Sequence, residues 1–234
     1  VTDRQEILSL TGGGGKTTVI RRLQKECRDR NIFHGVSTTT HMQYEKNKSF
    51  LGIPSLESFF EIYEACGTVW MGEPVSEAKM RGFPESFLQK VIESGAWLLL
   101  EADGAKCLPV KAPEIHEPVI LTETTRVIQV YGLDGLGRPI GECCFRSHRV
   151  AEILGKKESD RLTETDLANL AVSPQGGRKM VGDHPCHVVL NKADTLKMVR
   201  KAVAVGEKIL ECGMEHVYIT SQLMKADRER MHSD

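Results

Sequence analysis

The sequence predicts an α/β fold in which a mostly parallel, twisted sheet carries helices on both faces. Three observations predict this class. Short apolar runs alternate with longer amphipathic stretches along the chain, which is typical of repeated strand–helix units. A turn of four glycines, Gly12–Gly15, separates the first apolar run from the first amphipathic stretch. Residues 96–100 are apolar at every position, as in a strand buried on both faces of a sheet.

The first half of the chain supplies four expected strands and three expected helices. Residues 7–10 form an apolar strand, and the helix over 16–30 is rich in Arg, Lys, Gln and Glu. A second strand covers 35–38. A helix over 56–65 and a short strand over 68–71 lie in residues 44–82, a possible inserted subregion whose topology the sequence leaves open. A helix over 85–93 ends before Gly95, and the apolar run that follows is expected to be a central strand.

The second half continues the alternation. Residues 126–131 alternate as a strand does, and a glycine-rich loop over 132–141 follows. Thr163 is the expected N-cap of a helix over 164–172. Residues 186–190 form another apolar strand, a helix over 197–212 ends at Gly213, and 217–220 form the last strand. The charged tail, 225–234, is expected to fray.

Length and composition favour a single cytoplasmic domain over the whole chain, residues 1–234. A chain of this size buries roughly 70 to 75% of its unfolded surface. Its 31 basic and 32 acidic residues nearly cancel, so no nucleic-acid or membrane partner is expected. No apolar run approaches the length of a membrane helix, and no signal-peptide core follows the polar start. The seven scattered cysteines fit reduced thiols, including the adjacent Cys143 and Cys144.

The glycine turn and the residues after it predict a phosphate site. Gly12, Gly13, Gly14 and Gly15 remove every Cβ that would keep backbone N–H groups from converging on an anion. The sequence then reads Lys16, Thr17 and Thr18. We expect Lys16 to bridge the β- and γ-phosphates, Thr17 to offer its hydroxyl to Mg²⁺, and the helix N-terminus to add its dipole. The match to the phosphate-loop pattern is incomplete, since Leu10 stands where that pattern has its first glycine.

Acidic residues follow the strand expected over 96–100. Glu101 and Asp103 are expected at the carboxyl edge of the sheet, where one holds Mg²⁺ through a bound water and the other orients the attacking water. The sequence does not decide which does which. Gly104 would let the backbone approach the γ-phosphate. Thr39 and Thr40 leave the second strand and suit a switch loop that contacts Mg²⁺, although threonine is also common in strands.

A second motif predicts how a base is recognised. Asn191, Lys192 and Asp194 form the pattern Asn-Lys-x-Asp directly after an expected strand. A carboxylate at Asp194 accepts from both N1–H and the N2 amine of guanine, which adenine does not offer. Ser221 follows the last expected strand with Thr220, where a backbone N–H would face guanine O6. GTP is therefore favoured, with an adenine nucleotide as the open alternative.

Two polar clusters suit a second ligand. Lys106, Lys111, His116 and Glu117 lie in a proline-bracketed loop that would hold an anionic substrate or a partner surface, unless it is a solvated connection. The same two interpretations apply to a similar cluster formed by Arg146, His148 and Arg149.

Five segments together resemble the YqeC family: 12–18, the Ser-Thr-Thr-Thr-His cluster, 99–106, 111–118 and 190–194. The resemblance implies a P-loop NTPase fold and an accessory role for selenium-dependent molybdenum hydroxylases. It implies as partners such a hydroxylase or its cofactor-assembly proteins.

The chain is also similar, more distantly, to metallocentre-maturation GTPases of nickel enzymes, whose Glu-x-x-Gly motif is matched by Glu101 and Gly104. Thr11 stands where that wider class often has a lysine, which leaves a homodimer open. The metal-binding Cys and His motifs of these GTPases have no clear counterpart, and Cys186 and His187 are expected to begin a buried strand.

Three functions remain open on the sequence. The leading one is a Mg²⁺-dependent NTP hydrolase or switch that acts in hydroxylase maturation. The second is a small-molecule kinase that passes the γ-phosphoryl group to a substrate at Lys106, Lys111 and His116. The third is a scaffold that binds nucleotide without hydrolysing it and changes partner affinity through the threonine loop.

Overall fold

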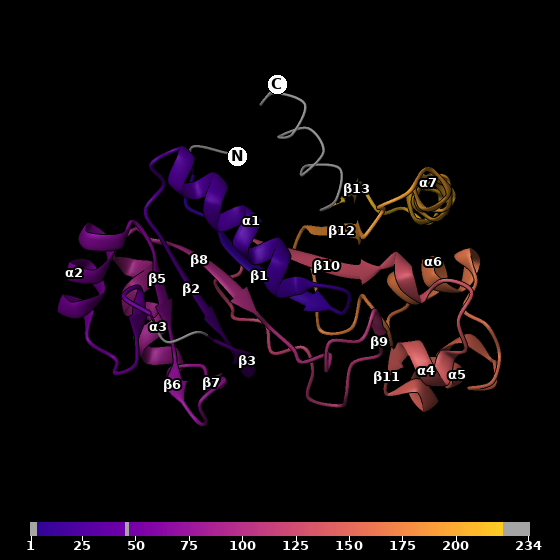
Figure 1. The fold of residues 1–234 in the computed structure, drawn as a ribbon, viewed down its shortest axis with the longest axis horizontal. Coiled ribbons are helices and arrows are strands. Elements are labelled where there is room, and N and C mark those ends of the chain that lie inside the picture. The colour runs from indigo at the N-terminus through magenta and orange to yellow at the C-terminus, as the bar shows by residue number, and fades with distance from the viewer. Residues whose placement is uncertain (1–3, 45–46, 222–234) are drawn as a thin grey trace, which may run out of the picture. The chain divides into compact units, whose positions relative to one another are not determined.

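A computed structural model describes residues 4–44 and 47–221, and the chain in it forms two compact units. Unit 1 comprises Val1–Thr11, Lys16–Gly104 and His116–Val127, and unit 2 comprises Gly12–Gly15, Ala105–Ile115 and Ile128–Asp234. In the described residues, eight strands form a sheet in the order β13-β12-β10-β1-β8-β2-β5-β4 (Figure 1). The pairs β1–β8, β2–β8, β2–β5, β4–β5 and β12–β13 are all parallel. The predicted α/β fold with a mostly parallel sheet is confirmed.

Unit 1 contains the helix that follows the glycine turn and the strand expected to be central. Its strands are β1 (Ile7–Gly12), β2 (His34–Thr38), β3 (His41–Gln43), β4 (Phe50–Leu51), β5 (Val69–Met71), β6 (Glu73–Pro74), β7 (Lys79–Arg81) and β8 (Trp97–Glu101). Its helices are α1 (Lys16–Asp29), α2 (Leu56–Cys66) and α3 (Glu85–Glu93). β8 lies between β1 and β2 in the sheet, so the expectation of a central strand is confirmed. Residues 44–82, whose topology the sequence left open, contribute β6 and β7 to an antiparallel sheet in the order β3-β7-β6.

The core of unit 1 is apolar and partly aromatic. Phe59, Met71, Leu98 and Leu100 are buried in one cluster. Phe33 packs edge-on against Phe59, with ring centroids 5.5 Å apart. Burying such side chains contributes roughly 1.5 to 3 kcal/mol each, which explains why the apolar run of β8 lies inside the sheet.

Unit 2 contains the remaining elements. Its strands are β9 (Val110–Lys111), β10 (Arg126–Gly132, which begins in unit 1), β11 (Cys144–Phe145), β12 (Cys186–Asn191) and β13 (His216–Ile219). Its helices are α4 (Ile140–Cys143), α5 (Ser147–Leu154), α6 (Glu164–Val172) and α7 (Leu196–Glu211), with a 3₁₀ turn at Leu133–Gly135. The expected loop over 132–141 is therefore wrong at both ends, because the 3₁₀ turn follows its first residue and α4 begins before its last. α5 was not predicted, and the expected tail over 225–234 lies outside the described residues.

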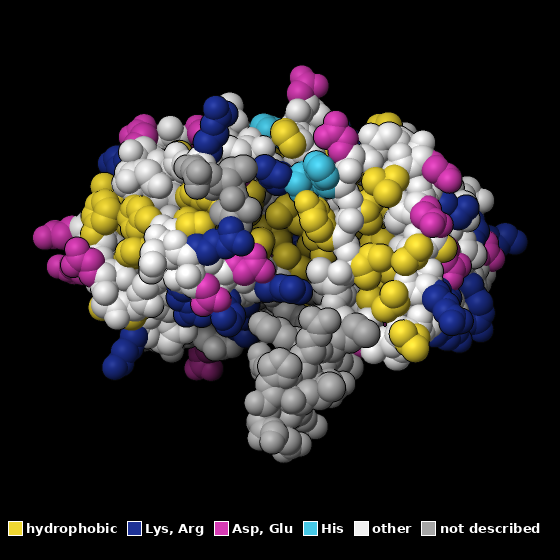
Figure 2. All heavy atoms as spheres, turned by 90° about the horizontal axis from the view of Figure 1, so that it is seen from above, with side chains coloured by type: hydrophobic (Ala, Val, Ile, Leu, Met, Phe, Trp, Pro, Cys, Tyr) yellow, Lys and Arg dark blue, Asp and Glu magenta, His cyan; other side chains and the backbone are white. Residues whose placement is uncertain are grey.

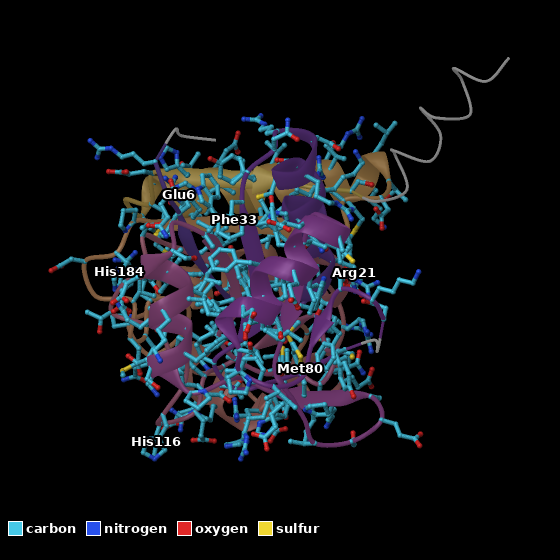
Figure 3. The ribbon with its side chains drawn as sticks, turned by 90° about the vertical axis from the view of Figure 1, so that its left-hand side faces the viewer. Glu6, Arg21, Phe33, Met80, His116 and His184 are labelled. Atoms are coloured by element: carbon cyan, nitrogen blue, oxygen red, sulfur yellow. The ribbon has the colours of Figure 1, made fainter. Side chains whose placement is uncertain are left out.

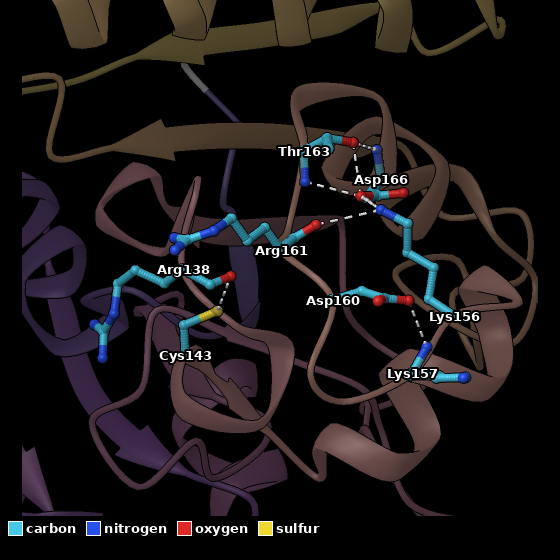
Figure 4. A network of polar contacts seen from close by, with 8 residues as sticks. All are labelled: Arg138, Cys143, Lys156, Lys157, Asp160, Arg161, Thr163 and Asp166. Atoms are coloured by element: carbon cyan, nitrogen blue, oxygen red, sulfur yellow. Dashed lines mark hydrogen bonds and ion pairs between the residues drawn. The ribbon is translucent and has the colours of Figure 1, made fainter.

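The start of α6 shows how one predicted helix boundary is fixed. Thr163 accepts from the backbone N–H of Asp166, and Asp166 accepts from that of Thr163, which completes a capping box (Figure 4). Lys156 forms an ion pair with the Asp166 carboxylate. The predicted N-cap is confirmed, because two N–H groups that a helix start leaves without acceptors are satisfied here.

The surface carries both signs of charge. On the face seen in Figure 2, Lys and Arg side chains are interspersed with Asp and Glu, and apolar side chains lie among them. This matches the formal net charge of −1. Among the described residues, no helix combines the length and apolar character that crossing a bilayer requires.

A buried histidine predicts acid sensitivity. His34 in β2 is fully buried, and its Nδ1 lies 2.7 Å from the Ile32 carbonyl. Burial lowers the pKa of His34, since charging the ring in the core is unfavourable. The unfolded chain then binds more protons than the folded chain below pH of about 6.5, so stability present above that pH is lost as pH falls.

We expect the free energy of unfolding to fall by up to about 1.4 kcal/mol per pH unit as the pH drops below about 6.5. Urea titrations of the wild type and of His34→Phe measure it. The His34→Phe protein should show a flatter dependence, and His41→Phe, at an exposed histidine, should not. Equal slopes for the wild type and His34→Phe would contradict this assignment.

Candidate functional site

Lys16, the first residue of α1, is the centre of a buried charged cluster in unit 1. Its Nζ lies 3.1 Å from Asp103 Oδ1 and 3.8 Å from Glu101 Oε1. The lysine residue is 4% exposed and Asp103 2% exposed. β1 and β8 run parallel with Leu10 opposite Glu101, so the residues that follow the two strands leave the same edge of the sheet. The fold therefore brings together the three residues predicted to be catalytic.

The protonation state of Lys16 follows from this environment. Burial alone lowers the pKa of Lys16, but the carboxylates of Asp103 and Glu101 outweigh burial and hold that pKa above its usual value. Glu117 adds a smaller contribution in the same direction. The side chain is thus a fixed cation at every physiological pH.

Thr17 and Glu101 supply hard oxygen atoms next to this cation. The Thr17 hydroxyl donates to Glu101 Oε2 at 3.0 Å. Mg²⁺ in phosphate sites is bound through one or two carboxylates, waters and substrate phosphates. The hydroxyl and the carboxylates of Glu101 and Asp103 fit such an ion, completed by phosphate oxygens. In the described residues, no group of three or more His, Cys, Asp or Glu could hold a metal without such a substrate.

The glycine turn has a different set of contacts from the one expected. The Gly13 N–H donates to the Val130 carbonyl and the Gly14 N–H to the Leu108 carbonyl, both at 2.9 Å. A Cβ on Gly14 would lie 2.0 Å from the Gly132 nitrogen. Because the glycines have no side chains, the turn lies close to two other backbone segments of unit 2. In this conformation the amides of Gly13 and Gly14 donate to protein carbonyls and do not face an anion.

Other amides suit an anion better. Thr17 and Thr18 lie in the first turn of α1, where backbone N–H groups have no acceptor within the helix. The positive end of the helix dipole lies at the same turn. An anion at this terminus would be bound by these amides and by Lys16.

The threonines after β2 contact backbone carbonyls. Thr38 donates to the Glu101 carbonyl at 2.6 Å, and Thr39 donates to the Val119 carbonyl at 2.7 Å. The Thr40 N–H donates to the Thr38 hydroxyl. The Thr39 hydroxyl, a predicted metal ligand, would have to leave Val119 to reach an ion. The Thr38 hydroxyl, in the same predicted cluster, is likewise engaged with the backbone.

The predicted base-binding residues form a second cluster, in unit 2. Asn191 Nδ2 donates to the Gly14 carbonyl at 2.9 Å, and the Thr220 hydroxyl donates to Asn191 Oδ1. The Ser221 hydroxyl donates to Asp194 Oδ1 at 2.6 Å, which orients that carboxylate. β12 and β13 are parallel neighbours, so these residues meet where the two strands end. The fold thus ties Asn191 to the glycine turn, 177 positions away in the sequence.

Lys192 has an uncommon backbone conformation and forms an ion pair. Its φ of 66° lies in the left-handed region, which is uncommon for a residue with a side chain. Its Nζ lies 2.8 Å from Asp134 Oδ2. No sequence pattern singles out Asp134, because the pairing depends on how the 3₁₀ turn after β10 meets this loop.

The predicted second-ligand residues belong to both compact units. Lys106 and Lys111 belong to unit 2 and lie near the Phe145 ring, whereas His116 belongs to unit 1 and is exposed, pointing outward in Figure 3. Arg146 and Arg149 share the Glu114 carboxylate, at 3.2 and 3.3 Å. His148 is exposed on α5. Phe145 and Glu114 were not predicted as contacts of these cations, because the sequence does not show which side chains β9 and β11 bring together.

The cysteines carry no metal-site geometry in the part of the chain that the structure describes. All seven are free thiols there. Cys143 and Cys144 have sulfurs 3.6 Å apart, and the Gln129 side-chain amide donates to Cys186 in the core. His187 packs against the His216 ring, with centroids 4.4 Å apart. The predicted buried strand at Cys186 and His187 is confirmed.

Comparison with known proteins gives a family. The family described as YqeC protein matches residues 8–148. The chain is 28% identical over 186 residues to a protein of Escherichia coli strain K12 named "Uncharacterized protein YqeC", a match that covers 76% of this chain and 72% of that protein. No solved structure matches the chain significantly. The matched residues include the glycine turn, Lys16, Glu101 and Asp103, and on this evidence the chain belongs to the YqeC family.

Proposed function

We propose that the protein binds a nucleoside triphosphate, GTP in preference to ATP, with Mg²⁺ and hydrolyses it. The observation that carries the proposal is the buried contact of Lys16 with Asp103 and Glu101 at the start of a helix that follows a glycine turn. The accessory role in maturing selenium-dependent molybdenum hydroxylases rests on the YqeC resemblance. The cellular partner on this proposal is such a hydroxylase or its cofactor-assembly machinery.

Lys16 exchanges partners when the triphosphate binds. Its ammonium is held between two carboxylates, and the β- and γ-phosphates offer oxygens of equal or greater charge. Because the cation is already desolvated, it interacts with an incoming anion in a medium of low effective dielectric constant. The carboxylate released from Lys16 is then available to the nucleotide's water and metal.

On this proposal Glu101 and Asp103 have different roles, one in binding Mg²⁺ and the other in orienting the attacking water. Glu101 accepts from the Thr17 hydroxyl, which favours it on the metal side of the site. Asp103, two residues further along, is the candidate that orients the attacking water. When bound, Mg²⁺ supplies positive charge that neutralises the phosphate oxygens during phosphoryl transfer.

Base selection rests on Asp194 and the residues that hold it. The Ser221 hydroxyl donates to one oxygen of the Asp194 carboxylate. A carboxylate has about four acceptor sites, so it can also accept from two donors of guanine. An adenine ring presents no such donor pair. The buried Asn191 connects this loop to the glycine turn through the Gly14 carbonyl.

Calorimetric titration with GTP and ATP in Mg²⁺ tests binding, and steady-state phosphate release tests hydrolysis. GTP is expected to bind more tightly than ATP. No saturable binding of either nucleotide would refute the proposal. Tighter ATP binding would remove the guanine preference. Binding without phosphate release would support a non-hydrolysing scaffold instead.

The base assignment predicts a change of specificity. In Asp194→Asn the amide oxygen can accept from only one of the two guanine donors, so GTP affinity should fall by about a hundredfold, equivalent to one lost hydrogen bond with a charged group. The Asn amide donates to the C2 carbonyl of xanthine, so xanthosine triphosphate should bind this variant better than GTP does. Calorimetry with both nucleotides measures the reversal.

The matched control is Asp183→Asn, at an exposed position of unit 2. It should leave the order of GTP and xanthosine triphosphate as in the wild type. An Asp194→Asn protein with unchanged GTP affinity would show that this carboxylate does not contact the base.

A further inference from the structure

Three cationic side chains of unit 2 surround one aromatic ring. Lys106 Nζ lies 5.2 Å, Lys111 Nζ 6.0 Å and Arg146 Cζ 4.5 Å from the centroid of Phe145. We call these three side chains and the ring the Phe145 cation cluster. β9 and β11 are parallel neighbours with Phe145 opposite Lys111, so the pairing of two short strands creates the cluster from two separate parts of the chain.

The neighbourhood of the ring is rich in positive charge. Arg146 and Arg149 both contact the Glu114 carboxylate, and Arg146 also donates to the Ala112 carbonyl at 3.3 Å. Together with Lys106 and Lys111, these arginines gather four cationic side chains around the ring and the Glu114 carboxylate. Like charges gathered at one place repel each other, and their attraction to the ring face offsets part of that repulsion.

The backbone is also held in an uncommon conformation at these positions. The φ angles of Lys106, Cys107 and Arg146 are 46°, 61° and 57°. Residues with side chains seldom adopt this left-handed region, and they persist in it where surrounding structure imposes it, often at ligand sites. Two of the three cationic residues of the cluster, Lys106 and Arg146, have this backbone conformation.

We propose that the Phe145 cation cluster binds a small phosphate-like oxyanion. Arg146 presents a planar guanidinium that donates to two oxygens of one anion, while Lys106 and Lys111 add point charges. Glu114 already places a carboxylate on Arg146 and Arg149, so an anion of higher charge competes for the same donors. The site belongs to unit 2, and it goes beyond the proposed function because binding there requires no nucleotide.

The size of the cluster favours a small anion over a polynucleotide. Nucleic-acid surfaces need several phosphate contacts along a groove or stripe, whereas the cations here converge on one ring. The ligand class is therefore a phosphate group, free or carried on a small metabolite.

Equilibrium dialysis with radiolabelled inorganic phosphate tests the site. With saturating GTP and Mg²⁺ present, so that the site at Lys16 is occupied by nucleotide, the wild type should bind one phosphate per chain. Lys106→Gln and Lys106→Gln/Arg146→Gln should each weaken binding by about tenfold or more, as for a lost hydrogen bond to a charged group. Lys90→Gln/Arg200→Gln, at two exposed helix positions, is the matched control and should bind as the wild type does.

Several results would overturn the inference. These are the absence of saturable phosphate binding, equal affinity of the wild type and both cluster variants, and loss of all phosphate binding when GTP is added, which would put the anion at the start of α1 beside Lys16. Tighter binding of a labelled single-stranded oligonucleotide through the same two residues would also overturn it. Should the double variant unfold, Lys106→Gln decides, because Lys106 is exposed. GTP titration of the same proteins tests the proposed function, and its outcome does not depend on whether the cluster binds phosphate.

Discussion

Lys16→Met is expected to abolish measurable GTP binding and to lower the free energy of unfolding by about 3 to 5 kcal/mol. Methionine removes the cation but leaves the Asp103 and Glu101 carboxylates, which are 3% and 10% exposed. A buried charge without its partner is among the most destabilising changes in a protein interior. GTP affinity should fall by about a hundredfold or more, because the phosphates lose charge-assisted hydrogen bonds.

A second substitution separates the two effects. Lys16→Met/Asp103→Asn removes the cation together with the carboxylate nearest to it, so a large part of the lost stability should return while GTP binding stays absent. Denaturant titration and calorimetry on the single and double variants give the coupling energy between the two side chains.

Lys25→Met in the same helix is the matched control. Lys25 is half exposed and pairs with Asp29 at 2.6 Å, a surface pair separated by four residues. Its loss should change stability by less than about 1 kcal/mol. A Lys16→Met protein as stable as Lys25→Met would show that the buried ion pair contributes little, and retained GTP binding would refute the phosphate role of Lys16.

Gly14→Ala is expected to prevent stable folding, with a loss of more than about 4 kcal/mol. The added Cβ would lie 2.0 Å from the Gly132 nitrogen and 2.5 Å from its Cα, and backbone atoms of a paired segment have little freedom to withdraw. The φ of Gly14, +74°, adds the ordinary cost of a left-handed residue, about 1 to 2 kcal/mol. The effect is steric and occurs without any nucleotide.

Gly137→Ala measures that ordinary cost alone. Gly137 has a similar φ of +83°, and its added Cβ would meet no atom within 4 Å. Urea unfolding of both variants should show a loss of about 1 to 2 kcal/mol for Gly137→Ala and a far larger one for Gly14→Ala. If Gly14→Ala folds normally and loses only GTP binding, the glycine serves the anion and the close approach to Gly132 is unimportant.

The strands and helices were largely predictable from local patterns. The all-apolar run of β8 and the periodic pattern of α3 are properties of short windows of sequence, and the predicted bounds of α3 and α6 agree with the structure. Prediction was poorer for residues 132–155. There the chain forms a 3₁₀ turn and the short helices α4 and α5, and segments of four to eight residues carry too few periods to identify a helix.

The candidate site was predictable as a set of residue types but not as a set of contacts. The sequence pointed to Lys16, Glu101 and Asp103 because a cation after a glycine turn and carboxylates after a buried strand have few other uses. The role it suggested for the glycines differs from the one in the structure, since Gly13 and Gly14 donate to carbonyls of unit 2. It also grouped His116 with Lys106 and Lys111, whereas the fold assigns His116 to the other compact unit.

What the sequence determined by itself is the α/β alternation and the place of the glycine turn between β1 and α1, and it supplied the prediction of which residues bind phosphate, Mg²⁺ and a base. The tertiary structure alone decided that Lys16 is paired with Asp103, that Asn191 is tied to Gly14, and that Lys106 and Lys111 meet on Phe145. The physical reason is the distance along the sequence over which each interaction acts. Backbone preference and hydrophobic period act over a few neighbouring residues, whereas these contacts join residues as far as 177 positions apart and depend on how strands pair and loops pack.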